Sequence, residues 1–321
     1  MQLRARVQQH IRSLHMWRWL LLLAAVLTTT AQAPALPPVA GRLIDIGGRK
    51  LHLLCSGRGS PTVVLVAGGG AFSIDWALVQ SKVAASRRVC SYDRAGLAWS
   101  DSGPADETVE QTVSDLHALL QSAGERQPFV LVGASIGGLY IRAYHRQFPT
   151  EVSGLVFSNS SNRVGFAANG INGLLWELSE DQIRSAFPLP SVSSPAPTRE
   201  ADPFDRLPVD FQATRLQFDI QLWERAKSTP PDPVSMLSWR KEFIREFDET
   251  ESGPPPLGTL PVVVLTSDPL IADASHRTRD GASARLAFLS TNTTFVVARG
   301  SGHEIHLYQP DSVVRAIESI K

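Results

Sequence analysis

Residues 129–138, FVLVGASIGG, decide which fold this chain is expected to adopt. Residues 129–132 form a short apolar run typical of a buried strand, and residues 137–146 carry apolar side chains at helical spacing. Ser135 therefore lies on a tight turn from strand to helix, where the residues two positions away on either side must be very small. Its hydroxyl would be exposed beside a helix N-terminus, which favours negative charge. This pattern indicates a nucleophile elbow, since a chance Gly-x-Ser-x-Gly in a loop would lack the flanking strand and helix.

The composition is that of a globular protein with balanced charge. The chain has 321 residues, 43% hydrophobic and 19% charged, which is enough for a large core with an inserted subdomain. The 31 basic residues equal the 31 acidic residues, so no basic excess points to nucleic acid. We therefore expect a small-molecule partner and no nucleic acid.

The first 33 residues have the composition of an export signal. They contain several arginines and no acidic residue, with an unbroken apolar run at residues 19–27 and an Ala-x-Ala end at residues 31–33. The apolar run falls short of the about 20 residues that a membrane span needs. We expect a periplasmic or secreted protein, which contacts a membrane only if residues 17–30 stay uncleaved as a tether.

Strands and helices alternate along most of the remaining chain, which predicts an α/β fold with a mostly parallel, eight-stranded sheet and helices on both faces. The first two strands are expected to form a hairpin across residues 47–48. Strands are expected at residues 41–46, 49–55, 61–66, 88–92, 129–132, 152–158, 261–266 and 293–297, and helices at 76–86, 108–123, 137–146, 283–289 and 310–320.

Residues 160–258 interrupt this alternation because they are rich in proline. Helical segments are expected between the prolines, at residues 210–227 and 233–247. We interpret this region as an inserted helical cap, with residues 40–159 and 259–321 forming the core. Tryptophans in the cap could line an apolar pocket or simply fix the cap to the core; they are Trp176, Trp223 and Trp239.

A serine hydroxyl becomes a nucleophile when an adjacent imidazole takes its proton. His303 follows the strand at residues 293–297, and in a parallel sheet that loop emerges at the same edge as Ser135. His306 is the local alternative, three residues further on. Other histidines are expected on the surface, in packed positions or at the wrong edge of the sheet.

The imidazole needs an orienting partner, and three residues qualify. Asp268 follows the strand at residues 261–266 and fits the chain order Ser, acid, His; Asp273 lies further along the same loop. Asp268 could equally be a turn residue before a proline. Asn159, after the strand at residues 152–158, could orient a ring nitrogen but could not stabilise an imidazolium.

An oxyanion hole needs two backbone N–H groups aimed at one point. We expect one from Ile136, the residue after the serine, and one from Gly69 in the Gly68-Gly69-Gly70 loop. That loop lacks the following Gly-Lys-Ser/Thr of a phosphate-binding loop.

Together these segments resemble the α/β-hydrolase fold superfamily, and the similarity extends over nearly everything outside the signal and the cap. The resemblance implies Ser135 as nucleophile and His303 as base, although members of this style often carry His and Asp where this chain has Ala134 and Asn159. The matching motifs are Gly68-Gly69-Gly70, Ser91-Tyr92-Asp93-Arg94-Ala95-Gly96 with Trp99-Ser100, the elbow at residues 133–138, and Ser301-Gly302-His303 with Gln309-Pro310.

The resemblance also implies that the second and fourth strands are neighbours. Those strands carry Cys55 and Cys90, so we expect a disulfide between them, which export would permit.

We expect an exported serine hydrolase, a carboxylic ester hydrolase, that cleaves an ester or related acyl bond through an acyl-enzyme. Its substrate would be a small, partly apolar acyl compound, and no metal or organic cofactor is implied. The alternative is a catalytically weak or silent ligand-binding protein of the same fold, because Asn159 leaves the identity of the acid open.

Overall fold

The computed structural model describes residues 37–104, 108–162, 179, 181, 194–229, 233–268 and 284–321. The expected signal segment, Trp176 and Asp273 lie outside these residues, so what was expected of them stays a prediction. Within the described ranges, no helix combines the length and apolar character needed to span a membrane.

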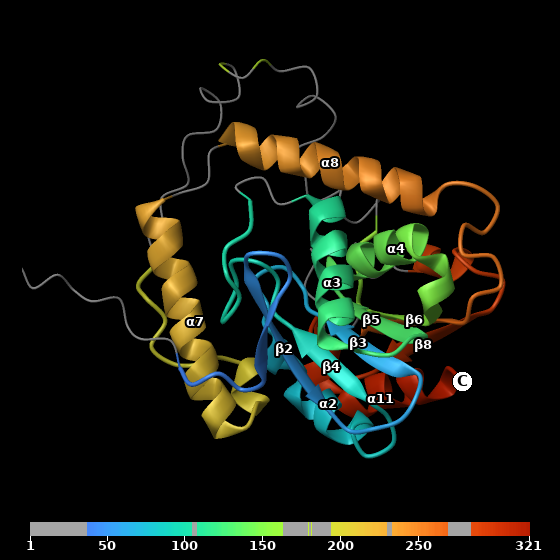
Figure 1. The fold of residues 1–321 in the computed structure, drawn as a ribbon, viewed down its shortest axis with the longest axis horizontal. Helices are drawn as coiled ribbons and strands as arrows, with labels where there is room; N and C mark the ends of the chain where they lie inside the picture. The colour runs from blue at the N-terminus through green and yellow to red at the C-terminus, as the bar shows by residue number, and fades with distance from the viewer. Residues whose placement is uncertain are drawn as a thin grey trace, which may run out of the picture. The chain divides into compact units, whose positions relative to one another are not determined.

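Eight strands form one sheet in the order β1-β2-β4-β3-β5-β6-β7-β8 (Figure 1). The pairs β1–β2 and β2–β4 are antiparallel, and the other neighbouring pairs are parallel, which confirms the predicted mostly parallel sheet. The strands are β1 (Arg42–Asp45), β2 (Lys50–Ser56), β3 (Thr62–Val66), β4 (Val89–Tyr92), β5 (Phe129–Ala134), β6 (Val152–Ser158), β7 (Val262–Ser267) and β8 (Thr293–Ala298).

The central strands are buried on both faces, which explains why they appear in the sequence as continuous apolar runs. The described helices and 3₁₀ turns are η1 (Ser73–Trp76), α2 (Ala77–Val83), α3 (Val109–Ala123), α4 (Gly137–Gln147), η2 (Pro149–Glu151), η4 (Phe204–Arg206), α7 (Val209–Ser228), α8 (Pro233–Glu251), η5 (Ala284–Phe288), α10 (Ile305–Tyr308) and α11 (Pro310–Ser319). One hydrophobic cluster packs α3 and α4 against the sheet, and a second packs α2 and α11.

The helix expected at residues 283–289 is present as the five-residue 3₁₀ helix η5. After η5 the chain is tied back to the segment before β7. Leu257 N donates to Leu289 O, and Ser290 Oγ donates to Leu260 O.

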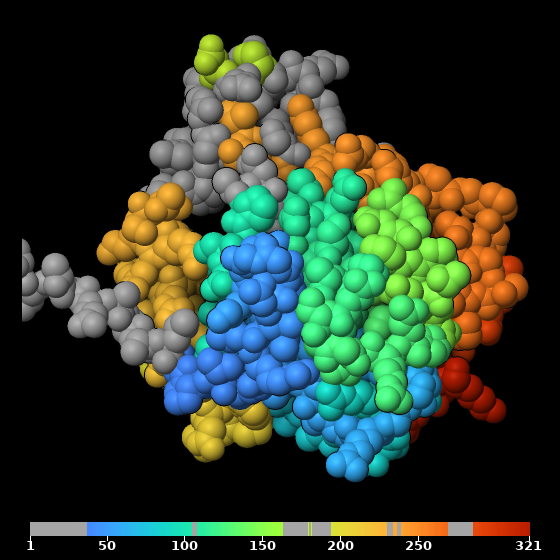
Figure 2. Space-filling model, viewed as in Figure 1, coloured from blue at the N-terminus to red at the C-terminus, as the bar shows by residue number. Residues whose placement is uncertain are grey.

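Between β6 and β7 the chain forms the two long helices expected for the cap, α7 and α8. In the space-filling view, atoms of α8 lie against those of α3 and α4 (Figure 2). Ion pairs reinforce this contact: Arg142 of α4 binds Glu251, and Arg146 binds Glu246. The exact division between cap and core stays a prediction.

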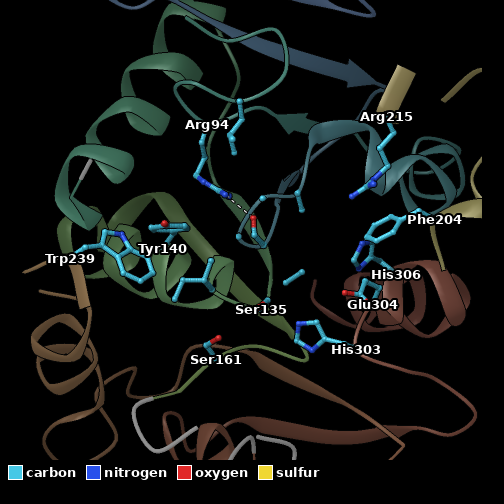
Figure 3. A pocket seen from close by; sticks show the side chains of 17 residues that line it. Arg94, Ser135, Tyr140, Ser161, Phe204, Arg215, Trp239, His303, Glu304 and His306 are labelled. Carbon is cyan, nitrogen blue, oxygen red and sulfur yellow. Dashed lines mark hydrogen bonds between the residues drawn. The ribbon is translucent and has the colours of Figure 1, made fainter. Parts of the chain in front are cut away.

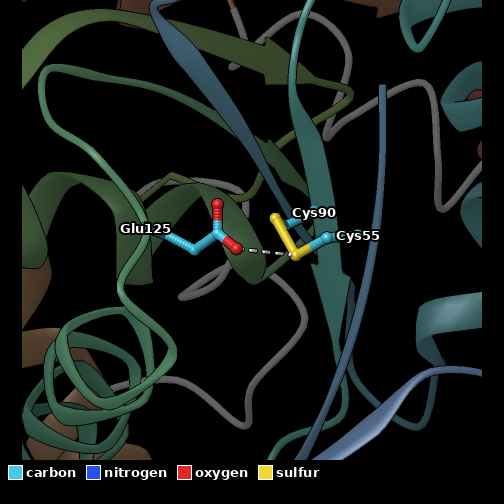
Figure 4. Close-up of side chains that lie close together, drawn as sticks. All are labelled: Cys55, Cys90 and Glu125. Atoms are coloured by element: carbon cyan, nitrogen blue, oxygen red, sulfur yellow. Dashed lines mark hydrogen bonds between the residues drawn. A yellow bond between two sulfur atoms is a disulfide. The ribbon is translucent and has the colours of Figure 1, made fainter. Parts of the chain in front are cut away.

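Cys55 and Cys90 face each other across the β2–β4 pair and form the expected disulfide (Figure 4). The Glu125 carboxylate lies against it, with Oε1 3.5 Å from Cys55 Sγ. Because disulfide sulfurs carry no proton and offer no thiolate, this cluster is a contact and not a metal site. Arg88 neutralises Glu125 through two hydrogen bonds, of 3.0 and 2.7 Å.

Replacing both cysteines with serine should lower the free energy of unfolding. The disulfide joins residues 35 positions apart, and opening a loop of that length costs about 3 to 4 kcal/mol. Denaturant titrations of the oxidised protein and the Cys55→Ser/Cys90→Ser variant measure the difference, with the reduced wild type as a matched control. Equal midpoints, or two free thiols by mass spectrometry without reductant, would contradict the expectation.

Candidate active site

Ser135 lies on the turn between β5 and α4 with a backbone φ of 52°. This left-handed conformation is uncommon for residues other than glycine, costs roughly 1–3 kcal/mol, and persists only where the surroundings enforce it. Three hydrogen bonds do so. Ser135 N donates to Ser158 O at 3.2 Å, and Ser135 O accepts from Gly138 N at 3.1 Å and from Ser161 N at 2.8 Å. The turn is thus held by its own helix and by the end of the neighbouring strand.

The two glycines of the Gly-x-Ser-x-Gly pattern are required by close backbone approach. A Cβ on Gly133 would lie 2.5 Å from Gly137 O, and a Cβ on Gly137 would lie 2.5 Å from Val66 O. Both distances are shorter than any non-bonded carbon–oxygen contact allows. The tight packing that was inferred from the sequence pattern is therefore present.

Ser135 and His303 line one cavity of about 540 Å³ (Figure 3). His303 lies on the loop between β8 and α10, so the two predicted residues meet at the same edge of the sheet. Trp239 of α8 also lines the cavity, whereas the Trp223 indole donates to Ser194 O. The cavity is lined by residues 68–71, Arg94, Leu97, residues 134–136, Tyr140, Ser161, Phe204, Arg215, Trp239, His303, Glu304 and His306.

The side chain beside His303 Nδ1 is that of Asn159, whose Nδ2 lies 2.9 Å away. The same amide nitrogen donates to Ser267 Oγ at 3.1 Å. Asn159 follows β6 with φ of 45°, a conformation that asparagine tolerates better than most residues. Whether Nδ1 accepts or donates in this contact depends on the tautomer of the His303 ring. A base must take a proton at Nε2, which requires the ring proton on Nδ1.

Asp268 lies at the end of β7 and holds the loop that carries His303. Its Oδ2 accepts from Gly300 N at 2.9 Å, and its backbone N donates to Ser301 O at 3.0 Å. The assignment of Asp268 as the catalytic acid stays a prediction, as does that of Asp273.

The glycine loop lies directly against the elbow. A Cβ on Gly68 would lie 3.2 Å from Ser135 Cβ, and a Cβ on Gly69 would lie 3.9 Å from Ile136 Cγ2. Within the described part of the chain, no hydrogen bond is donated by the backbone N–H of Gly69 or Ile136. The two N–H groups expected to form an oxyanion hole therefore come from segments in contact, and their roles stay a prediction.

Arg94 fixes the glycine loop, a role that the sequence did not reveal. Its two terminal nitrogens donate to Ala67 O and Gly68 O, each at 2.7 Å. Its guanidinium also lies over the Tyr140 ring, 5.3 Å from the centroid. The Asp-Arg-x-Gly turn was recognised as a motif, but no sequence pattern shows that its arginine reaches across to a different loop.

Arg215 of α7 joins the region between β6 and β7 to the core. Its Nε donates to Asp75 Oδ1 at 2.8 Å, and its Nη1 binds Glu200 at 2.9 Å and also Asp219. Its Cζ lies 3.4 Å from the centroid of Phe204. Burial raises the pKa of Asp75 to about 6, and the charge of Arg215 partly opposes that shift. The cavity wall here thus carries a cation that is already neutralised by several carboxylates.

Comparison with known proteins matches residues 63–316 to the family described as "Alpha/beta hydrolase family". The uncharacterized protein YqjL of Bacillus subtilis is 28% identical over 265 residues, which cover 82% of this chain and 85% of YqjL. The 2-hydroxymuconate semialdehyde hydrolase of Pseudomonas sp. strain CF600 is 33% identical over 132 residues, covering 40% of this chain and 46% of that protein.

Two further curated relatives match over shorter segments. The probable transporter efuK of Hormonema carpetanum is 35% identical over 108 residues, which cover 32% of this chain and 16% of that protein. YbdG of Bacillus subtilis is 23% identical over 118 residues, 36% of each chain. This chain therefore spans well under two thirds of the length of these two relatives.

Solved structures share the fold at low sequence identity. The meta-cleavage product hydrolase CumD of Pseudomonas fluorescens IP01 has a TM-score of 0.60 at 18% identity, covering 88% of this chain and 98% of its own. An esterase from Thermogutta terrifontis has a TM-score of 0.56 at 22% identity, covering 84% and 92%.

Replacing Arg215 with methionine should lower the free energy of unfolding by about 3 to 5 kcal/mol at pH 8, because buried carboxylates lose their cation. The loss should shrink at pH 5. Since the pKa of Asp75 is raised by folding, the folded state binds more protons than the unfolded state, and stability falls as pH rises. Without the Arg215 charge, the pKa of Asp75 is raised further, so the free energy of unfolding of the variant falls more steeply as pH rises. Urea denaturation at both pH values measures the effect.

Arg245→Met is the matched control, because the Arg245 side chain is 63% exposed and pairs with Glu246 and Glu249 at 3.7 and 3.8 Å. It should change stability by less than about 1 kcal/mol. If the two variants lose the same free energy of unfolding at both pH values, the buried ion pairs of Arg215 stabilise the fold no more than an exposed pair does.

Proposed function

Because the chain belongs to the alpha/beta hydrolase family, we propose that it is a serine hydrolase acting on an ester or related acyl bond of a small, partly apolar substrate. The observation that carries the proposal is the shared cavity of Ser135 and His303, with Ser135 held in the strained turn of a nucleophile elbow. The hydrolase and esterase names of several relatives support this reaction class.

In the proposed reaction, Ser135 Oγ attacks the carbonyl carbon while His303 takes the hydroxyl proton. The negative charge that develops on the carbonyl oxygen is stabilised by the N–H groups of Gly69 and Ile136, positioned by Arg94. The tetrahedral species then collapses, His303 protonates the leaving alcohol, and an acyl-enzyme remains. Water, deprotonated by His303, hydrolyses the acyl-enzyme to the acid and free Ser135.

The partner of His303 sets how fast this chemistry runs. Asp268 is the proposed acid, and the Asn159 amide lies at hydrogen-bond distance from Nδ1. The amide at this position supports a second candidate function, a catalytically weak or silent protein that binds a ligand in the same cavity.

We also propose that the protein is exported. The signal-like composition of the first 33 residues supports export. The disulfide between Cys55 and Cys90 is consistent with it, because disulfides persist in oxidising compartments.

A fluorophosphonate probe should label the wild-type protein on Ser135 and should not label Ser135→Ala. The elbow exposes the hydroxyl to the cavity, so a phosphonylating reagent reaches it. Ser161→Ala is the matched control, because Ser161 lines the same cavity and should leave labelling intact. Mass spectrometry of the labelled peptide identifies the site. Label that persists in Ser135→Ala, or is missing from the wild type, would remove the proposed nucleophile.

Asp268→Asn should lower kcat/KM for p-nitrophenyl acetate by roughly 10⁴, because an amide does not stabilise the imidazolium that forms on His303. Asn159→Asp should change kcat/KM little, and Asn159→Leu serves as a comparison. If Asn159→Asp raises kcat/KM by roughly 10² or more and Asp268→Asn leaves it unchanged, the assignment of Asp268 as the acid is wrong.

A further inference from the structure

His306 is a second histidine in the cavity, three residues after His303 and only 5% exposed. Its ring packs on the Trp76 indole, with 4.5 Å between centroids. Its Nδ1 is fully buried and has no hydrogen-bond partner among the described residues. Nε2 is not among the fully buried atoms that lack a partner, and no hydrogen bond of the described residues involves it, so Nε2 is the accessible ring nitrogen of a residue that lines the cavity.

The ring is neutral at physiological pH. Burial, together with the charges of His303 and Arg215, lowers the pKa of His306 to about 3. A neutral imidazole has one N–H donor and one acceptor nitrogen. A buried N–H without an acceptor is rarer than an under-satisfied acceptor, so the proton lies on Nε2 and not on the enclosed Nδ1. His306 therefore offers the cavity one uncharged donor.

His306 lies on the side of the cavity where a leaving group is expected. Figure 3 shows His306, Glu304 and Arg215 on the same side of Ser135 as His303, whereas Tyr140 and Trp239 lie on the opposite side. The imidazole that protonates the departing alcohol must lie next to it. The alcohol portion of an ester therefore belongs beside His306, and the acyl portion belongs between the aromatic side chains.

The neighbouring charges restrict what the His306 N–H can bind. A carboxylate on the alcohol portion would meet Glu304, and Arg215, which lines the same side of the cavity, already binds several carboxylates. An ammonium group offers no acceptor to an N–H donor. An uncharged oxygen suits the site, because it accepts from Nε2 without introducing a charge.

We infer, building on the proposed hydrolase function, that His306 is a specificity-determining residue whose Nε2–H binds a hydroxyl or ether oxygen on the alcohol portion of the substrate. The favoured substrates are then esters of oxygenated alcohols and not simple alkyl esters. A site with a buried donor discriminates against a substrate that lacks the acceptor, because the donor would remain unpaired.

The test compares 2-methoxyethyl butyrate with butyl butyrate, which differ by one ether oxygen in place of a methylene. The ratio of their kcat/KM values should be about fivefold higher in the wild type than in His306→Phe, since one hydrogen bond contributes about 1 kcal/mol. The ratio in His306→Phe corrects for the different reactivities of the two alcohols. His306→Gln, which keeps an N–H donor, should recover part of the preference. Equal ratios in wild type and His306→Phe would overturn the inference.

A binding measurement separates this inference from the proposed reaction. In Ser135→Ala, 2-methoxyethyl butyrate should shift the His306 Nε2–H resonance in ¹H–¹⁵N spectra, and butyl butyrate should not. If neither ester is hydrolysed but this shift is seen, the reaction is wrong and the recognition by His306 stands. If both esters are hydrolysed and neither shifts the resonance, the recognition is wrong and the reaction stands. The absence of both hydrolysis and shift overturns both.

Discussion

The left-handed backbone of Ser135 is the constraint on which the rest of the site depends. A strand that continued past Ala134 would carry the serine away from the sheet edge, and a looser turn would leave room for other side chains. Instead the chain reverses within a few residues, and Gly137 lies where its missing Cβ would meet Val66 O. This single turn sets the direction of α4, brings the glycine loop after β3 against the serine, and leaves the hydroxyl facing the cavity.

Much of this arrangement could be predicted, because it is encoded in short segments. The apolar runs of β3, β5 and β7 have the length and composition of buried parallel strands, and the glycine spacing around Ser135 has one structural explanation. The disulfide needed the relative order of strands, which came from the resemblance to a fold family. The 3₁₀ form of η5 was not predicted, because local periodicity does not show where the chain is tied back by Ser290.

Contacts between distant segments could not be predicted from the same patterns. Arg94 reaches two carbonyls that lie 26 and 27 positions earlier in the chain, and Arg215 reaches Asp75 across 140 positions. Nothing in the local sequence distinguishes these arginines from solvated ones. Arg94 binds carbonyls of the glycine loop that borders the cavity, and Arg215 binds Asp75 in η1. A buried polar connection therefore joins α7 to the core beside the cavity.

The asparagine after β6 has a consequence for the history of this chain. Asn159 holds a left-handed conformation that aspartate also tolerates, and its side chain already lies beside an imidazole. Codons for asparagine and aspartate differ in one base. A carboxylate would fit this position without a change in the backbone, the neighbouring strand or the loop carrying His303. A single nucleotide substitution could therefore exchange the amide for an acid during evolution without rebuilding any other part of the protein.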